Sequence, residues 1–179
     1  MNELKRFRTC EFPLVLALAL TGCGGGGSAG SAAALTPHEQ LAQLEATGVL
    51  PALDRGDSVA GIDANANGVR DDIERYIEKK YTVSAERAAA MQMARAHQQM
   101  LLVDKSNEIA LDRVSGGSFR AIVCLGSTFA GPDASNSSLV RTEIRALTTN
   151  TKERLLAYLA YNKARSGSVS RLPEGETCE

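Results

Sequence analysis

Twelve consecutive residues, 63–74, place oxygen-bearing side chains at intervals suited to holding a metal ion. Their sequence is DANANGVRDDIE, in which such side chains fall at positions 1, 3, 5, 9 and 12 and glycine falls at position 6. Ca²⁺ is a hard cation that takes six to eight oxygen ligands. One short loop can supply them when alternate side chains converge and the backbone turns sharply, so this spacing predicts a calcium site.

Each predicted donor has an expected role. The six donors are Asp63, Asn65, Asn67, Val69, Asp71 and Glu74. The first three would each give one side-chain oxygen, and Val69 would give its backbone carbonyl. Asp71 would bind directly or through a water molecule. Glu74, on the helix that follows, would close the shell with both carboxylate oxygens, and Gly68 would permit the sharp turn.

This spacing resembles the EF-hand loop, because it matches the D-x-[DN]-x-[DN]-G-x5-E signature at every specified position. The resemblance covers about twelve of the 179 residues. An EF-hand has a helix that runs straight into position 1, whereas Pro51, Gly56 and Gly61 interrupt the approach here. Position 8, usually aliphatic and paired with a partner loop, is Arg70, and we find no second loop. The pattern is more similar to the lone, half-EF-hand loops of bacterial surface proteins, such as those in dockerins.

The charge of the loop bears on its affinity. Asp63, Asp71 and Glu74 bring three negative charges, and the two asparagines bring none. We expect an unpaired site of this kind to bind weakly, with Kd on the order of 10⁻⁴ to 10⁻³ M, as in extracellular modules. Such a site suits a structural ion outside the cytoplasm. The alternative interpretation is a polar turn that merely caps the next helix, because Asp and Asn favour such turns.

The first 22 residues have the layout of a secretory signal. Lys5, Arg6 and Arg8 form a basic leader, and residues 13–20 form an apolar core of eight residues. This core is far shorter than the ~20 residues that span a bilayer. Residues 20–23 are LTGC, which resembles the lipobox of bacterial lipoproteins. In that family the cysteine, here Cys23, carries acyl chains such as palmitate, and the signal is cut before it. The alternative is an ordinary signal peptide with a chance cysteine.

The lipoprotein resemblance implies a membrane-anchored protein of the cell envelope. Residues 23–35 form the lipidated cysteine and a tether rich in Gly, Ser and Ala. Eight such residues, 24–31, would span about 15 Å as a flexible coil. Gly24 rather than Asp follows the cysteine. In a cell with two membranes, the resemblance therefore favours the outer membrane, with the domain facing the periplasm.

Length and charge limit the number of domains and the class of partner. Without residues 1–22 the chain has 157 residues, which suits one domain, here 36–179. The leader holds three of the 20 basic and two of the 21 acidic residues, so 17 and 19 remain and the net charge is about −2. This charge does not favour nucleic acid as a partner.

The cysteine count predicts one disulfide. Cys10 leaves with the signal and Cys23 is lipidated, so Cys124 and Cys178 remain as a pair in an oxidising compartment. Their bridge would pin an irregular C-terminal segment to the domain and contribute about 4 kcal/mol on the chain-entropy model. The alternative is a reactive thiol at Cys124 with His97 as its base, which the apolar residues around Cys124 disfavour.

Hydrophobic periodicity predicts an all-α fold, a small helical bundle. A capping box at residues 36–39, with proline at the first helical position, begins a short helix that Gly48 ends. Residues 51–62 form a loop rich in turn formers. An amphipathic helix then begins near Arg70, with Asp72 away from its apolar side, and Ser84 caps a longer one. That helix carries an apolar stripe that includes Met93 and Met100, which we expect to be core rather than a promiscuous binding face. We expect His97 to lie at the surface or an interface.

The second half of the chain is less regular in pattern. We expect the helical pattern to continue to about residue 114, with an interruption at Asn107, and to break at residues 115–118. Residues 119–129 are an apolar strand or helix, with helix favoured. Residues 140–159 form the last helical region, which residues 148–151 split, with Asn150 and Glu153 as the second cap.

Three functions fit these features. The first is a structural or partner-binding module of the cell envelope, anchored by lipid, stabilised by one Ca²⁺ and docked to an envelope protein or wall component. The alternative is a calcium-dependent envelope hydrolase that acts on peptidoglycan or polysaccharide, although the sequence shows no catalytic constellation. Calcium could also act as a regulator that orders the loop for a partner.

Overall fold

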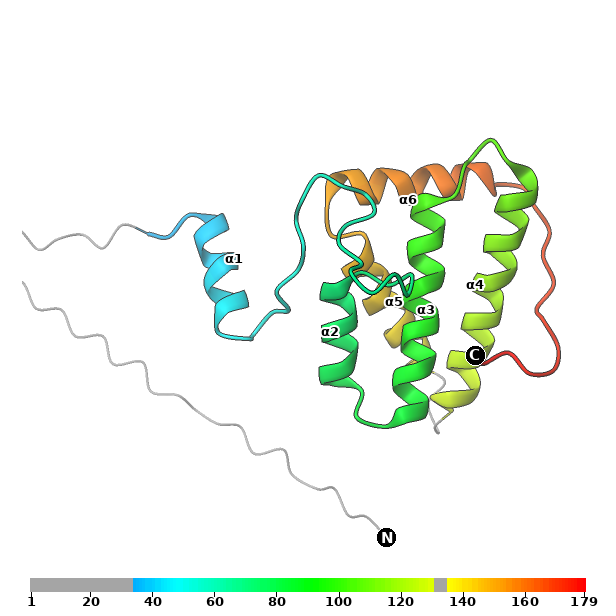
Figure 1. Ribbon diagram of the computed structural model, residues 1–179, viewed down its shortest axis with the longest axis horizontal. Coiled ribbons are helices and arrows are strands. Elements are labelled where there is room, and N and C mark those ends of the chain that lie inside the picture. Colours follow the sequence, from blue (N-terminus) through cyan, green and yellow to red (C-terminus); the bar gives the residue numbers. More distant parts are fainter. Residues whose placement is uncertain (1–33, 131–134) are drawn as a thin grey trace, which may run out of the picture. The chain divides into compact units, whose positions relative to one another are not determined.

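The computed structural model describes residues 34–130 and 135–179, and within them all regular structure is helical. The helices are α1 (Pro37–Ala46), α2 (Asp71–Lys80), α3 (Ser84–Leu102), α4 (Glu108–Thr128), α5 (Ser135–Thr148) and α6 (Lys152–Ala164) (Figure 1). The predicted all-α fold is therefore confirmed. Residues Thr36–Glu179 form one compact unit. The predicted signal peptide, Cys23 and residues 24–33 of the tether lie outside the described residues.

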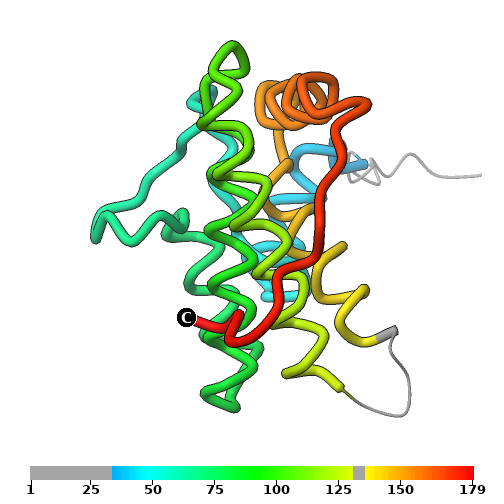
Figure 2. Tube along the Cα trace, turned by 90° about the vertical axis from the view of Figure 1, so that its right-hand side faces the viewer, coloured from blue at the N-terminus to red at the C-terminus, as the bar shows by residue number. Residues whose placement is uncertain are grey.

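Helix α3 is the centre of the bundle, because it packs against α2, α4, α5 and α6. In Figure 1, α6 runs across the ends of α3 and α4, and Figure 2 shows the same arrangement from the side. The main core joins apolar side chains of α2 to α5, including Ile77, Met93, Leu125 and Ile144. A smaller cluster of Met100, Leu111 and Tyr161 joins α3 and α4 to α6. The predicted role of the methionine stripe as core is confirmed.

Helix α1 begins and ends as predicted. Thr36 accepts from the Glu39 amide and Glu39 accepts from the Thr36 amide, which completes the capping box. Gly48 follows the helix with a left-handed φ of 73°. Every residue of α1 is exposed or half-buried. Local signals therefore define this helix, and tertiary packing adds little to it.

Helix α4 continues through residues 115–118, so the predicted break there is wrong. Asn107, predicted to interrupt a helix, instead caps α4 by accepting from the Ala110 amide. Ser115 and Ser118 are buried, and α4 makes its most extensive packing with α3. Small side chains allow the two helices to approach closely. This packing offsets the cost of about 1 kcal/mol that each helical glycine carries.

Two predicted caps are also wrong. Ser84 is the first residue of α3 rather than its cap, and Val83 precedes the helix. Thr151, not Asn150, caps α6 by accepting from the Arg154 amide at 3.3 Å. The Asn150 side chain is used elsewhere, because it donates to the Asp54 carbonyl at 2.8 Å.

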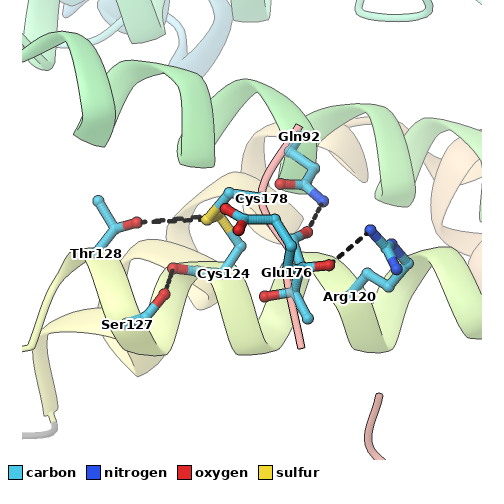
Figure 3. Close-up of a disulfide and its surroundings, with 8 residues drawn as sticks. Gln92, Arg120, Cys124, Ser127, Thr128, Glu176 and Cys178 are labelled. Atoms are coloured by element: carbon cyan, nitrogen blue, oxygen red, sulfur yellow. Dashed lines mark hydrogen bonds between the residues drawn. A yellow bond between two sulfur atoms is a disulfide. The ribbon is translucent and has the colours of Figure 1, made fainter. Parts of the chain in front are cut away.

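The predicted disulfide is confirmed. Cys124 of α4 and Cys178 are bonded, with their Cα atoms 5.0 Å apart. The bond pins residues 168–179, an irregular segment, against α4 (Figures 2 and 3). The alternative of a reactive thiol at Cys124 with His97 as its base is therefore wrong.

Two fully buried arginines tie the loops to the helices. Arg70, before α2, pairs with Asp72 through two hydrogen bonds of 2.8 and 2.6 Å. It also donates to the carbonyls of Leu147 and Thr148, the last residues of α5. Asp72 was predicted to lie away from the apolar side, but it is 5% exposed because it accompanies Arg70 inward. Burial raises the pKa of Asp72, but hydrogen bonds from Arg70 and from the Asp54 amide outweigh that effect and hold it below its usual value.

Arg154 of α6 makes contacts of the same kind, an ion pair and bonds to backbone carbonyls, with the segment of residues 51–62. It pairs with Asp54 at 3.0 Å and donates to the carbonyls of Asp54 and Ser58 at 2.5 and 2.9 Å. The amide of Asp54 in turn donates to Asp72 at 2.8 Å, so the two ion pairs form one network. The network fixes the irregular segment 51–62, which has no helix, as predicted from its turn residues.

His97 was predicted to lie at the surface or an interface; it is 5% exposed, so it does not lie at the surface but between helices of the bundle. It lies on α3 with its ring edge-on to Tyr158 of α6, and in the described part of the chain neither ring nitrogen has a hydrogen bond of normal geometry. Burial, with smaller contributions from Arg145 and Arg141 of α5, lowers the pKa of His97 to about 4. The side chain is therefore a neutral core residue at neutral pH.

None of the helices in residues 34–130 and 135–179 combines the length and the apolar character that a bilayer crossing requires.

The depressed pKa of His97 predicts loss of stability in mild acid. The unfolded chain takes up a proton near pH 6.5 and the folded chain only near pH 4, so stability is complete above pH 6.5 and falls between these values. The full loss is about 3 kcal/mol, at 1.36 kcal/mol per pKa unit. Urea unfolding at pH 7 and pH 4.5 would measure it. We expect His97→Phe to reduce the pH dependence of the free energy of unfolding. His38→Gln, at the exposed histidine, should leave that pH dependence unchanged. The same pH dependence in all three proteins would contradict the role of His97.

Removal of the buried guanidinium of Arg154 should destabilise the fold strongly. Arg154→Met leaves the Asp54 carboxylate without its charge partner and the Ser58 carbonyl without its donor, and we expect a loss of about 3 kcal/mol, at the low end for a broken buried pair because Asp54 is partly exposed. Arg165→Met is the matched control, since its partner Asp112 is 71% exposed. That change should cost below about 1 kcal/mol. Equal losses in the free energy of unfolding of the two variants would show that the buried network stabilises the fold no more than an exposed ion pair does.

Candidate calcium-binding loop

Residues 63–70 form a tight turn that leads directly into α2. The backbone is left-handed at Ala66, with φ 55°, and at Gly68, with φ 84°. The glycine is where the sequence pattern requires it, since an L side chain rarely adopts that conformation. The amide of Asp71, at the start of α2, donates to the Ile62 carbonyl at 2.8 Å and closes the base of the loop.

The first predicted donor organises the turn. The two carboxylate oxygens of Asp63 accept from the Asn67 and Gly68 amides at 3.1 and 2.9 Å. Asn65 accepts from the Asn67 amide at 3.1 Å, and Asn67 accepts from the Val69 amide at 2.8 Å. These bonds draw three predicted ligand side chains toward the inside of one turn.

The last predicted donor faces the same place from α2. The Glu74 carboxylate accepts from the Asn65 amide group at 3.0 Å through Oε2 and from the Asn67 amide group at 2.7 Å through Oε1. Positions 3, 5 and 12 of the loop are therefore in direct contact. An asparagine side chain carries both a donor and an acceptor, so a half-turn about its Cβ–Cγ bond would present its oxygen to Glu74's side of the loop instead. A cation between them would replace the hydrogen-bonding protons that now satisfy Glu74.

The two remaining predicted donors lie at the edge of this cluster. Asp71 accepts from the Ala64 amide at 2.9 Å, which joins position 9 to position 2. The side chain of Val69 is fully buried in the core, so its backbone is held at the point where the loop enters the helix. The Val69 amide donates to the Asn67 side chain. The Val69 carbonyl, which is the predicted ligand, takes no part in the hydrogen bonds of the loop described above.

The donor chemistry fits a hard cation. The loop offers carboxylate, amide and carbonyl oxygens, and three carboxylates would neutralise a divalent ion. In the described part of the chain, no group of three or more His, Cys, Asp and Glu side chains is gathered closely enough to hold a metal unaided. The two asparagines lie between Asp63 and Glu74, so the amide oxygens would have to take part in binding.

The alternative interpretation, a turn that serves only to cap α2, fits the contacts less well. Arg70 occupies the capping position, and its side chain points into the core toward Asp72. The Asp63 carboxylate binds amides within the loop itself. The loop is thus organised by hydrogen bonds within it and to the side chains of Asp71 and Glu74, while the capping residue Arg70 makes no side-chain cap.

Sequence reasoning missed the side chains of α3 that dock the irregular segments. Gln92, Arg95 and Gln98 follow one another at intervals of three, and each donates to a backbone carbonyl outside the helices. Their acceptors are Thr177 at 2.9 Å, Asn67 at 2.9 Å and Ala60 at 2.6 Å, respectively. The interval of three was visible in the sequence, but the acceptors are between 28 and 85 residues away.

The structure adds no support to the hydrolase alternative. A cavity of about 440 Å³ lies between α2 and the segment that follows α1, and its lining includes Glu45 and Asp72. Both acids are engaged in ion pairs, with Arg55 and Arg70 respectively. Glycoside hydrolysis uses two carboxyl groups that face each other across a bound sugar, one of them poised as an acid. These two carboxylates are committed to structural contacts.

The loop therefore brings Asp63, Asn65, Asn67 and Glu74 into one hydrogen-bonded cluster, with Asp71 and Val69 at its margin. Arg95 supports this cluster from α3. Comparisons of this chain with protein-family models, with curated proteins and with solved structures find no match.

Proposed function

We propose that this chain is a lipid-anchored protein of the bacterial cell envelope that binds one Ca²⁺ in the loop of residues 63–74. Its helical domain would act as a structural or partner-binding module. The observation that carries the proposal is the position of Glu74, whose two carboxylate oxygens face Asn65 and Asn67 across the loop.

The bound ion would stabilise the folded state. It would offset the mutual repulsion of Asp63, Asp71 and Glu74 and join the loop to the first turns of α2. Ligand binding to the folded state alone stabilises it by mass action, by about 1.4 kcal/mol when the ion is at ten times its Kd. At the tighter end of the expected range, a Kd of about 10⁻⁴ M, this gain requires about 1 mM Ca²⁺, which suits a compartment outside the cytoplasm.

A patch on α6 supports the partner-binding part of the proposal. Leu155, Leu156 and Leu159 are 45, 54 and 50% exposed and lie close together on the helix. Groups of exposed large apolar side chains are typical of surfaces that contact other proteins. The anchor at Cys23 would hold such a surface near other envelope components.

Replacement of Glu74 should abolish calcium binding. Glu74→Gln removes one negative charge and one of the two oxygens that would close the shell, so we expect calorimetric heats of Ca²⁺ binding to disappear and the rise in Tm with 5 mM calcium to be lost. Glu78→Gln, on an exposed side chain one turn further along α2, is the control for charge and should bind like the unmodified protein. Equal calcium responses in the two variants would contradict calcium binding at this loop.

Acylation should depend on Cys23. Intact mass measurement of the protein from a bacterial membrane fraction should show a chain that begins at Cys23 and carries acyl groups, because the cysteine thiol is the acceptor. Cys23→Ser should lack them, whereas Cys10→Ser should mature normally, since Cys10 lies in the predicted signal. A mature chain that is cleaved elsewhere and bears no lipid would instead support an ordinary secretory signal.

A further inference from the structure

We infer that the ion pair of Arg95 and Glu179 sets how tightly the loop holds its cation, and that the Cys124–Cys178 disulfide keeps this pair assembled. The inference rests on the proposed calcium site. It makes Arg95 a positioning residue of that site, since Arg95 touches the loop backbone rather than the ion.

Arg95 is in contact with the loop through both halves of its side chain. Its Nε donates to the Asn67 carbonyl at 2.9 Å, at position 5 of the loop. Its aliphatic part lies over Gly68, where an added Cβ would be 3.1 Å from the Arg95 Cγ. The glycine therefore has a second purpose besides its left-handed φ, because it allows α3 to approach the loop.

The same guanidinium also pairs with the C-terminal segment. Its Nη1 binds the Glu179 carboxylate. A positive charge fixed beside a divalent cation site opposes binding, and a carboxylate on that guanidinium offsets it. Glu179 thus raises the cation affinity of a loop from which it is more than a hundred residues away in sequence.

The position of Glu179 depends on how the segment before it is held. The Glu176 carbonyl accepts from Arg120 at 3.0 Å, and the Thr177 carbonyl accepts from the buried Gln92 at 2.9 Å (Figure 3). Cys178 is bonded to Cys124 of α4. The disulfide is the only covalent link among these contacts, and it is adjacent to Glu179. Its loss would release the carboxylate and leave Arg95 uncompensated beside the loop.

The expected effect is modest, because the pair is partly exposed. The side chains of Arg95 and Glu179 are 31 and 58% exposed, so water and salt screen their charges. We therefore expect the removal of the Glu179 charge to weaken calcium binding by about three- to fivefold at low ionic strength. The difference should shrink at 0.5 M salt, where the Debye length is about 4 Å.

The test compares Glu179→Gln with Glu176→Gln in calcium calorimetry at low and high salt. Both variants lose one negative charge from the same segment, but only the Glu179 side chain contacts Arg95, whereas Glu176 is held through its carbonyl. We expect weaker binding in Glu179→Gln alone, with the difference reduced by salt. Equal affinities in the two variants would overturn the inference and leave the calcium site standing. An unmodified protein that binds no calcium would overturn both the inference and the proposed function.

Reduction of the disulfide tests the second half of the inference. Dithiothreitol supplies two electrons and two protons, converts the bridge to two thiols and is itself oxidised to a cyclic disulfide. Reduction should weaken calcium binding in the unmodified protein to the level of Glu179→Gln and should have little further effect in that variant. Equal losses in both proteins would overturn the role of the disulfide. If reduction unfolds the chain by circular dichroism, Cys178→Ser examined under stabilising osmolyte provides the same comparison.

Discussion

The fold depends above all on two guanidinium groups that are fully removed from water. A buried charge is tolerated only when it is paired and when its remaining donors are used. Arg70 meets this requirement with Asp72 and with two carbonyls at the end of α5. Arg154 pairs with Asp54 and donates to two carbonyls of segment 51–62, while its Nε has no hydrogen-bond partner in the described residues. Apart from Asp72, which is two residues from Arg70, these partners meet the guanidinium groups only when the helices and the irregular segments have assembled. The network therefore specifies one arrangement of the chain, and the candidate calcium loop lies at its edge.

This network explains how a loop that resembles an EF-hand is held without an incoming helix. The segment before the loop has no regular structure, so its own hydrogen bonds cannot fix position 1. Asp54 and Ser58 are held by Arg154, and Ile62 accepts from the Asp71 amide across the base of the loop. Arg70, which departs from the usual aliphatic residue at position 8, anchors the exit of the loop in the core. The arginine at this position thus holds the loop in place where an EF-hand would use its incoming helix.

Features with local causes could be predicted from the sequence, and features with distant causes could not. The capping box of α1, the left-handed Gly48 and the spacing of the loop all arise from residues a few positions apart. The disulfide followed from counting the cysteines left over. By contrast, the burial of Asp72 follows from Arg70, whose further partners are more than 70 residues away. The continuation of α4 through residues 115–118 is likewise decided by packing on α3, which outweighs the low helix propensity of glycine.

Helix α3 carries a sequence pattern that indicates its contacts with irregular segments, although these contacts were not predicted. One side of it carries the apolar stripe, and Gln92, Arg95 and Gln98 recur at intervals of three beside that stripe. Backbone carbonyls in irregular segments lack the partners that helices and sheets provide, so they need donors from elsewhere. A row of amide and guanidinium groups on a central helix supplies such donors to the C-terminal segment, the candidate calcium loop and the approach to it. The pattern indicates that a helix docks irregular chain, but only the fold determines which carbonyls it meets. Because Arg95 of this helix contacts both the candidate loop and Glu179, we expect a change at the C-terminal segment to alter the loop.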